Sequence, residues 1–167
     1  MRPYVFRKIR AEEAPQMFSM ILQRMRCMRW MDQNGIRQWN VTEYDRAYPL
    51  EYYMEEQRRG RIFALADATA DRIMCAAILK EEDERWSDGV PALYIHNFVS
   101  KIDASGVGAY FLECAAEYAA QLGKEYLRLD SAADNPALAH YYERHGFLPA
   151  GECSDGPYHG ILRQRKL

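Results

Sequence analysis

A glycine-containing turn between an expected strand and an expected helix most constrains the fold of this chain. The aromatic and β-branched run at 94–99 predicts a strand, and Gly106-Val107-Gly108 opens the amphipathic helix that follows it. In such a turn the backbone N–H groups point into open space, and the helix N-terminus adds positive electrostatic potential. The turn therefore predicts a phosphate-binding site at the start of this helix.

A second helix with well-defined ends follows further along the chain. The run at 126–130 predicts a strand. After it, Asn135 and Pro136 are residue types preferred at the N-cap and first position of a helix, and Gly146 is the type preferred just past a helix end. The segment is therefore expected to form a strand, a turn and a short capped helix.

Together these two segments resemble the acetyl-CoA-binding core of the GNAT N-acetyltransferase superfamily. The family signature Arg/Gln-x-x-Gly-x-Gly/Ala is matched by residues 103–108, in which both glycines agree and the first residue, Asp103, does not. The family's Asn-x-x-Ala-x-x-Leu-Tyr-Glu-Lys-x-Gly-Phe is matched by residues 135–147, with Leu138 at the usual alanine and Tyr141 at the usual leucine. The resemblance implies the α/β (α+β) GNAT acyltransferase fold. Its mixed, mostly antiparallel sheet of about six to seven strands is splayed in the middle and flanked by about four helices.

The resemblance implies an enzyme that moves the acetyl group of acetyl-CoA to a primary amine by direct attack in a ternary complex. The alternative is a catalytically degenerate acyl-CoA-binding domain with a regulatory or binding role. Asp103 favours the alternative, because a carboxylate near a diphosphate weakens its binding. Asp103 either faces the diphosphate or turns away and caps the helix; Lys101 and Arg144 could then supply the positive charge.

The resemblance also implies which residues hold coenzyme A. The pyrophosphate is expected on the backbone N–H groups of the glycine turn, where glycine at 106 and 108 permits close approach of the backbone. The expected cofactor-binding residues are Phe98, Val99, Asp103, Ala104, Ser105, Gly106, Val107, Gly108, Asn135 and Tyr142.

The last helix carries two adjacent tyrosines, of which only one can face the site. Counted along the helix, Tyr142 shares a face with Leu138, whereas Tyr141 points about 100° away. By the resemblance, Tyr142 lies near the coenzyme A sulfur and protonates the departing thiolate. A core aromatic with a satisfied hydroxyl is the alternative for Tyr142, and Tyr141 is expected in the core.

Acetylation needs a neutral amine, so a base or a chain of water molecules must remove one proton from it. His96, on the strand before the glycine turn, is the first catalytic candidate, with a structural histidine as the alternative. Asp130 and Glu43 are the other candidates for the base. The carbonyl oxygen is expected to accept a hydrogen bond from the backbone N–H of Phe98 or Val99.

The remaining segments predict further strands and helices of one domain. Strands are expected at 4–10, 61–66, 72–80, 147–151 and 158–165, and helices from 11–15 onward and at 50–59. A stripe of Met17, Met20, Ile21, Met25 and Met28 predicts core packing, with substrate contact as the alternative. The segment 30–40 is expected to end the first helix at Asn34-Gly35 and to continue as an irregular loop before Pro49. Its two tryptophans, Trp30 and Trp39, predict either a lid on the core or an acceptor-site wall. The acidic loop at 81–89 is expected to serve solubility, with attraction of a cationic acceptor as the alternative.

Composition limits the number of domains and the kinds of partner. A chain of 167 residues with 49% hydrophobic content fits one domain, 1–167, and a net charge of −2 argues against nucleic-acid or membrane-surface partners. The acceptor partner is expected to be a small-molecule or peptide amine, and a homodimer stays open. Cys27, Cys75, Cys114 and Cys153 follow no metal-ligand spacing and are expected as small buried hydrophobes, so we expect no metal. The charged N-terminus predicts no signal peptide, and a cytoplasmic location is expected.

Overall fold

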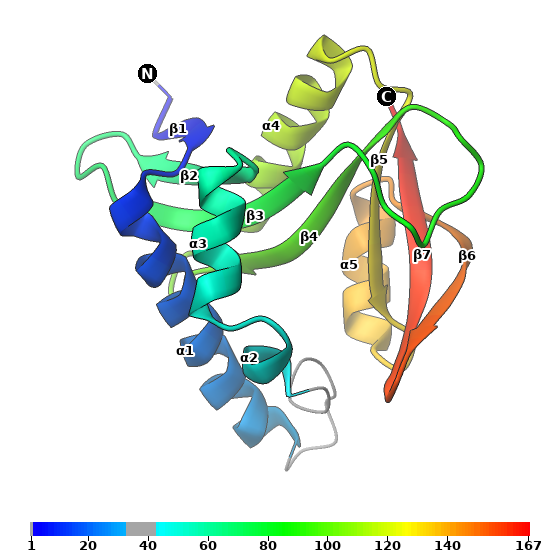
Figure 1. Ribbon diagram of the computed structural model, residues 1–167, viewed down its shortest axis with the longest axis horizontal. Helices are drawn as coiled ribbons and strands as arrows, with labels where there is room; N and C mark the ends of the chain where they lie inside the picture. The colour runs from blue at the N-terminus through cyan, green and yellow to red at the C-terminus, as the bar shows by residue number, and fades with distance from the viewer. Residues whose placement is uncertain (1, 33–42) are drawn as a thin grey trace.

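The protein is built around one open sheet with helices on both faces (Figure 1). The computed structural model describes residues 2–32 and 43–167, with side chains at 2–27 and 43–167. The strands are β1 (Tyr4–Lys8), β2 (Ile62–Asp67), β3 (Ile73–Lys80), β4 (Ala92–Ser100), β5 (Tyr126–Ala132), β6 (Leu148–Asp155) and β7 (Tyr158–Lys166). The helices are the 3-10 turn η1 (Ala11–Glu13), α1 (Ala14–Asp32), α2 (Tyr44–Ala47), α3 (Leu50–Arg58), α4 (Val107–Gln121) and α5 (Pro136–Arg144).

The seven strands follow the order β1-β2-β3-β4-β5-β7-β6. Neighbouring strands are antiparallel except for β4 and β5, which are parallel and pair only between Ala92–Tyr94 and Tyr126–Arg128. Beyond these pairs the two strands diverge, and the ribbon shows the sheet opening between them (Figure 1). The expected GNAT fold class, with its splayed and mostly antiparallel sheet, is confirmed.

Two hydrophobic cores hold the helices on the sheet. The core on the α4 and α5 face contains Phe111 of α4 and Phe147, and the core on the α1 and α3 face contains Met17 and Tyr53. Strand residues alternate between the two cores, because successive side chains of a strand point to opposite faces. The stripe of α1 is core packing as predicted for Met17, Met20, Ile21 and Met25, which are all buried, whereas the Met28 side chain lies outside the described ones.

Two expectations for the fold are wrong, and others fall on residues that the structure does not describe. The segment before Pro49, expected to be irregular, contains the short helix α2. Of the four cysteines, Cys75 is buried and the other three are partly exposed, so the prediction of four buried thiols is wrong. The expected helix end at Asn34-Gly35, the side chain of Trp30 and all of Trp39 lie outside the described residues. Among the residues that are described, no helix is both long and apolar enough to cross a bilayer.

Candidate active site

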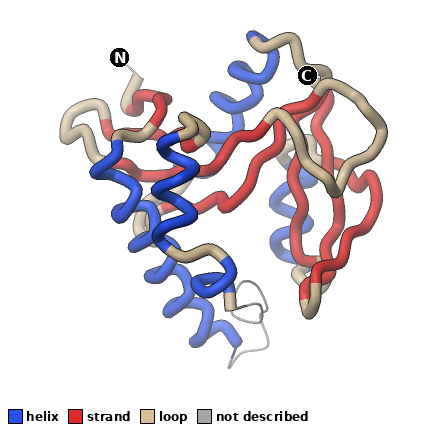
Figure 2. The backbone as a smooth tube through the Cα atoms, in the orientation of Figure 1, coloured by secondary structure: helices blue, strands red, loops and turns tan. Residues whose placement is uncertain are grey.

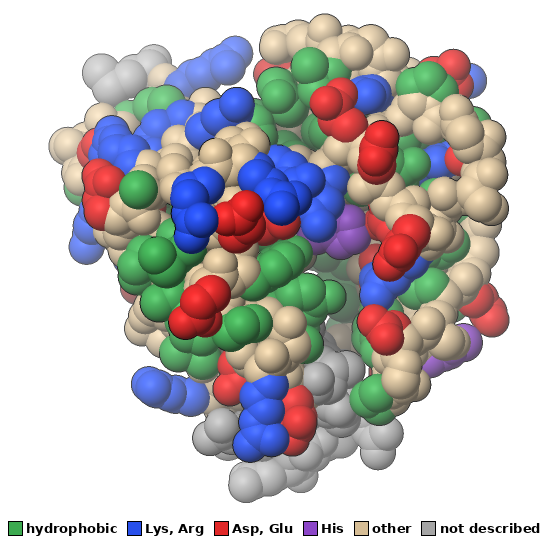
Figure 3. Space-filling model, viewed as in Figure 1, with side chains coloured by type: hydrophobic (Ala, Val, Ile, Leu, Met, Phe, Trp, Pro, Cys, Tyr) green, Lys and Arg blue, Asp and Glu red, His purple; other side chains and the backbone are tan. Residues whose placement is uncertain are grey.

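The opening between β4 and β5 leads into a cavity of about 570 Å³. Figure 3 shows the surface hollowed between the two halves of the molecule. One part of its wall comes from α4, α5 and the ends of the central strands: Phe98, Val99, Ser100, Gly108, Leu129, Ser131, Ala132, Leu138, Tyr141 and Tyr142. The other part comes from α2 and the residue after it, from the loop before β4, and from β4, β5 and the β6–β7 hairpin: Tyr44, Ala47, Tyr48, Arg85, His96, Asn97, Asp130, Asp155, Gly156, Pro157 and Tyr158.

A bulge in β4 shapes the middle of this wall. The register shifts between Ala76 and Ile78 of β3, and Asn97 takes a positive φ of 54°. The Asn97 side chain donates a hydrogen bond to the Tyr44 hydroxyl and accepts one from the Tyr52 hydroxyl at 3.2 Å. A bulge leaves one residue of its strand unpaired and re-aims the backbone. Side chains of two helices therefore fix the point at which β4 turns away from β5.

The first turn of α4 contributes backbone groups to the site. The first hydrogen bond of the helix runs from the Tyr110 N–H to the Gly106 carbonyl at 3.2 Å, so the N–H groups of Val107, Gly108 and Ala109 precede it. Gly108 lines the cavity. A helix N-terminus at the edge of a cavity is a suitable place for an anionic phosphate group.

The two glycines of this turn are required for different reasons. Gly106 is the N-cap at a φ of 78°, and a Cβ built there would meet nothing within 4 Å. Its requirement is therefore conformational, because this φ favours glycine. At Gly108 a Cβ would lie 3.0 Å from the Tyr141 hydroxyl oxygen, so a phenol occupies the space that a side chain would need.

Asp103 does not cap α4. It is exposed in a turn closed by the Ala104 N–H and the Lys101 carbonyl at 3.2 Å, and the N-cap is Gly106 with no side-chain cap hydrogen bond. The capping alternative for this carboxylate is therefore wrong. Arg144 is exposed, and neither Lys101 nor Arg144 lines the cavity. Two other arginines do, Arg85 and Arg24 of α1, and the Arg24 guanidinium donates to the Ser100 carbonyl at 2.9 Å.

Only four of the expected cofactor-binding residues line the cavity: Phe98, Val99, Gly108 and Tyr142. The residues outside its lining are Asp103, Ala104, Ser105, Gly106, Val107 and Asn135. Asn135 is the N-cap of α5, as predicted, since its side-chain oxygen accepts from the Leu138 N–H at 3.0 Å. Val107 is buried in the core beneath the turn. No sequence signal singled out Arg24, which precedes its partner by 76 residues.

The adjacent tyrosines of α5 both line the cavity, with different surroundings. Tyr142 is buried, with its ring edge-on to Phe147 at 5.9 Å, and burial raises the pKa of its hydroxyl well above the ordinary value. Tyr141 is partly exposed and packs on the ring of His145 at 4.7 Å. The expectation that only one of these tyrosines faces the site is wrong, because both line the cavity. Tyr142 is also a member of the buried core, the alternative considered for it, whereas Tyr141, expected in the core, is only partly buried and packs against it.

A histidine–carboxylate pair lies on the other side of the cavity. His96 Nε2 is 3.0 Å from Asp83 Oδ2, and the other Asp83 oxygen accepts from the Arg85 N–H at 2.9 Å. Burial opposes ionisation of Asp83. The hydrogen bonds from His96 and the Arg85 backbone outweigh it and hold the pKa of this carboxyl below its ordinary value. Asp83 belongs to the loop expected to be only a solvated surface segment, and that expectation is wrong for this part of it.

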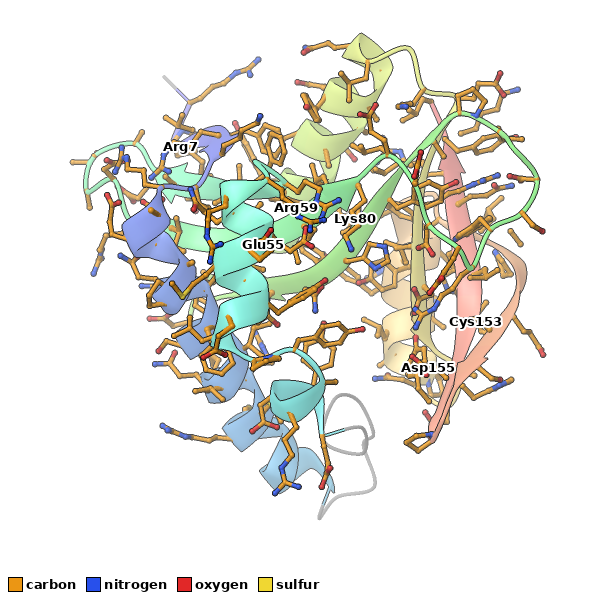
Figure 4. The ribbon with its side chains drawn as sticks, viewed as in Figure 1. Arg7, Glu55, Arg59, Lys80, Cys153 and Asp155 are labelled. Carbon is orange, nitrogen blue, oxygen red and sulfur yellow. The ribbon has the colours of Figure 1, made fainter. Side chains whose placement is uncertain are left out.

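Asp130 forms the centre of a second polar cluster. Its carboxylate accepts from Arg85 at 2.9 Å and from the Tyr158 hydroxyl at 2.6 Å, and Arg85 also lies 3.6 Å from Asp155. Asp155 lies on β6, across the molecule from α3, with Cys153 on the same strand (Figure 4). Glu43, the third candidate base, is exposed, pairs with Arg46 and lies outside the lining of the cavity.

The chain belongs to the Acetyltransferase (GNAT) family, whose model matches residues 23–147. It is accordingly an acyltransferase, and the acetyl donor of this family is acetyl-CoA. This confirms the resemblance and the expected cosubstrate. No curated protein sequence matches the chain.

Solved structures share the fold at low sequence identity. A GNAT acetyltransferase of Streptococcus agalactiae is 17% identical with a TM-score of 0.77, covering 98% of this chain and 95% of that one. A GNAT acetyltransferase of Listeria monocytogenes is 18% identical with a TM-score of 0.74 and the same coverage. The PaiA N-acetyltransferase of Thermoplasma acidophilum, solved with coenzyme A, is 17% identical with a TM-score of 0.72 and covers all of both chains.

Proposed function

We propose that the protein is an N-acetyltransferase that moves the acetyl group of acetyl-CoA to a primary amine by direct attack in a ternary complex. The observation that carries this proposal is the continuous cavity. It joins the first turn of α4 and Tyr142 to His96 through the opening between β4 and β5. Both reactants can therefore lie in one space, one on each side of the sheet.

The residues present suit a coenzyme A donor. The helix N-terminus offers N–H groups to a phosphate, and Arg24 adds a cation to the cavity wall. Phe98 and Val99 follow the bulge at Asn97 and line the cavity, where a backbone N–H would stabilise negative charge on the thioester oxygen. The solved PaiA N-acetyltransferase, which holds coenzyme A, supports the same use of this fold.

The reaction forms an N–C amide bond and breaks a C–S thioester bond, so the amine nitrogen loses a proton and the sulfur gains one. His96 is the proposed proton acceptor. Its Nε2 faces Asp83, which assigns the proton of a neutral ring to Nε2 and leaves Nδ1 to accept the proton. Because Asp83 is held ionised, it stabilises the imidazolium that results.

Asp130 is the less suitable base. Its oxygens already accept hydrogen bonds from Arg85 and Tyr158, and protonation of the carboxylate would disrupt both. We therefore assign Asp130 to the framework that orders the acceptor side of the cavity.

Tyr142 is the proposed proton donor to the sulfur. Burial raises the pKa of its hydroxyl, so the hydroxyl keeps its proton at neutral pH. Tyr141 is the matched control, because it also lines the cavity and its hydroxyl lies beside Gly108.

Cys75 and Cys153 do not line the cavity, which favours direct attack over an acetyl-cysteine intermediate. Burial raises the pKa of Cys75 strongly, and burial followed by the charge of Asp130 raises that of Cys153. Both therefore remain thiols at neutral pH, and the thiolate is the nucleophilic form.

The test combines binding with turnover. Acetyl-CoA at one hundred times its Kd should stabilise the fold by about 2.7 kcal/mol, which a thermal shift would detect. An amine library is then screened for acetyl-CoA-dependent release of free thiol. Binding together with thiol release on a primary amine supports the proposal. Binding without release on any amine would instead favour the acyl-CoA-binding domain that Asp103 suggested.

A further inference from the structure

A buried arginine connects β5 to the loop at 81–91. Arg128 is 1% exposed, and its guanidinium donates to both oxygens of Asp88 at 2.9 and 2.6 Å. It also donates to Gln164 at 3.1 Å and to the Tyr94 hydroxyl at 3.2 Å. The ring of Trp86 covers it, with the guanidinium carbon 4.1 Å from the ring centroid.

The loop supplies the counter-ion of this buried arginine, so its position affects how well the charge is neutralised. Arg128 comes from the sheet, whereas Asp88 and Trp86 come from the loop, which passes over the strands of this half (Figure 2). A buried cation is strongly destabilising unless it is paired with an anion. Movement of the loop away from the sheet would separate Arg128 from Asp88, so the pair holds the loop in place.

A second ion pair of opposite polarity sets where the loop lies along β5. Arg128 and Asp130 are two residues apart, so they point to the same face of the strand. Arg128 binds Asp88 of the loop, and Asp130 binds Arg85 of the loop at 2.9 Å. β5 carries a cation and an anion side by side, and the loop carries their two partners with the opposite charges. A shift of the loop along β5 would therefore bring like charges together.

The same loop carries the groups that face the acceptor side of the cavity. Its backbone turns between the Trp86 N–H and the Asp83 carbonyl at 3.1 Å, so the residue stacked on Arg128 is bonded to the residue that binds His96. Arg85 lies between them and reaches Asp130.

We propose that Arg128 is a positioning residue for the acceptor site: by holding Trp86 and Asp88 it fixes the loop so that Asp83 meets His96 and Arg85 meets Asp130. This inference rests on the proposed function, in which the amine binds on this side of the sheet. Arg128 does not line the cavity, so it acts through the loop. The cofactor side, built from α4 and α5, does not depend on the loop.

The main test variant is Asp88→Asn, which removes the counter-ion at an exposed position and retains the shape of the side chain. Trp86→Ala removes the ring that covers Arg128 and should also release the loop from the sheet. Glu84→Gln is the control, since it removes one negative charge from an exposed position of the same loop. Hydrogen exchange of the loop amides, acetyl-CoA affinity and the KM for the amine are measured on each protein.

Both test variants should speed hydrogen exchange of the Arg85 and Trp86 amides at least tenfold and raise the amine KM about tenfold. Their acetyl-CoA affinity should stay within twofold of the wild type. In Glu84→Gln all three quantities should be unchanged. Unchanged exchange would overturn the proposal. Faster exchange with an unchanged amine KM, or with an equal loss of acetyl-CoA affinity, would overturn it as well. If the wild-type protein acetylates no amine, the proposed function fails, and the exchange comparison still decides whether Arg128 holds the loop.

Discussion

The two sides of the cavity are assembled in different ways. The cofactor side comes mainly from one continuous stretch, residues 98–142, which runs from the end of β4 through the glycine turn, α4 and β5 to α5. The acceptor side brings together Tyr48, the loop at 83–88, His96, Asp130 and Tyr158, which are distant in the sequence. A local backbone motif can fix a binding site for a common cosubstrate, whereas the acceptor pocket depends on side chains that only the tertiary fold brings together.

The two sides also use different interactions. The turn of α4 offers backbone N–H groups and small residues, so its function depends on conformation and space. The acceptor side depends on charge pairs, in which Asp83, Arg85 and Asp130 each hold at least two partners. We therefore expect substitutions on the two sides to change different measured quantities.

The largest expected effect concerns the proton transfer at the junction of the two sides. Tyr142→Phe should lower kcat roughly 100-fold, because general acid catalysis contributes about 10²–10⁴ in rate. The ring and its packing on Phe147 are retained, so acetyl-CoA affinity should stay within a few-fold. Steady-state kinetics together with calorimetry would separate the two quantities.

Tyr141→Phe is the control for this variant and should change kcat much less. The raised pKa of Tyr142 also implies that its ionisation does not limit the rate below about pH 10. Turnover of Tyr142→Phe at the wild-type rate would exclude the acid role and leave Tyr142 as a packing residue.

The second effect tests the cofactor side through its glycines. In Gly108→Val the new side chain must displace the Tyr141 hydroxyl, which lies 3.0 Å from the Cβ position. Because that obstacle is the end of a side chain, the fold should survive, and acetyl-CoA affinity should fall about tenfold or more. Gly106→Ala should instead lower stability by about 1 kcal/mol through its positive φ, with a smaller loss of affinity. Equal affinities of Gly108→Val and the wild type would contradict this assignment.

Sequence reasoning succeeded where the chemistry is local. The glycine turn, the cap at Asn135 and the strands on either side are specified by neighbouring residues, and the structure places them as predicted. The same reasoning missed Arg24, Arg85 and Tyr158, whose partners lie between 28 and 76 residues away. It treated the loop at 81–89 as a solvated segment, because nothing in its composition shows that Arg128 is buried beneath it.

The third effect concerns stability on the acceptor side. Asp83→Asn should lower the free energy of unfolding at pH 7 by about 1 kcal/mol, since it removes a partly buried charged acceptor from His96. The folded pKa of Asp83 is below its ordinary value of 3.8, so this contribution is present above that value and is lost as the pH falls through the folded pKa. Denaturant unfolding should therefore separate the two proteins at pH 7, and the difference should shrink as the pH falls below 3.8 toward the folded pKa. A constant difference across this range would show that ionisation of Asp83 has no part in it.

The smallest effect concerns Asp103, where the sequence departs from the family signature on the cofactor side. The carboxylate is exposed and makes no cap for α4, so its replacement should leave helix stability unchanged. Asp103→Arg should tighten acetyl-CoA binding several-fold at low salt. A charge near a diphosphate in a partly wet site contributes on the order of 1 kcal/mol, and the substitution replaces repulsion by attraction.

Asp103→Asn is the matched control and should give a smaller gain, because it only removes the repulsion. Both gains should shrink as salt rises toward about 1 M, where the screening length falls to about 3 Å. Calorimetric titrations at two salt concentrations would measure these differences. Residue 103 precedes α4 on the cofactor side and has no part in the acceptor side. The arginine variant should therefore change the acetyl-CoA Kd and leave the amine KM unaltered. Weaker acetyl-CoA binding in Asp103→Arg would contradict this and show that the carboxylate itself contributes to cofactor binding.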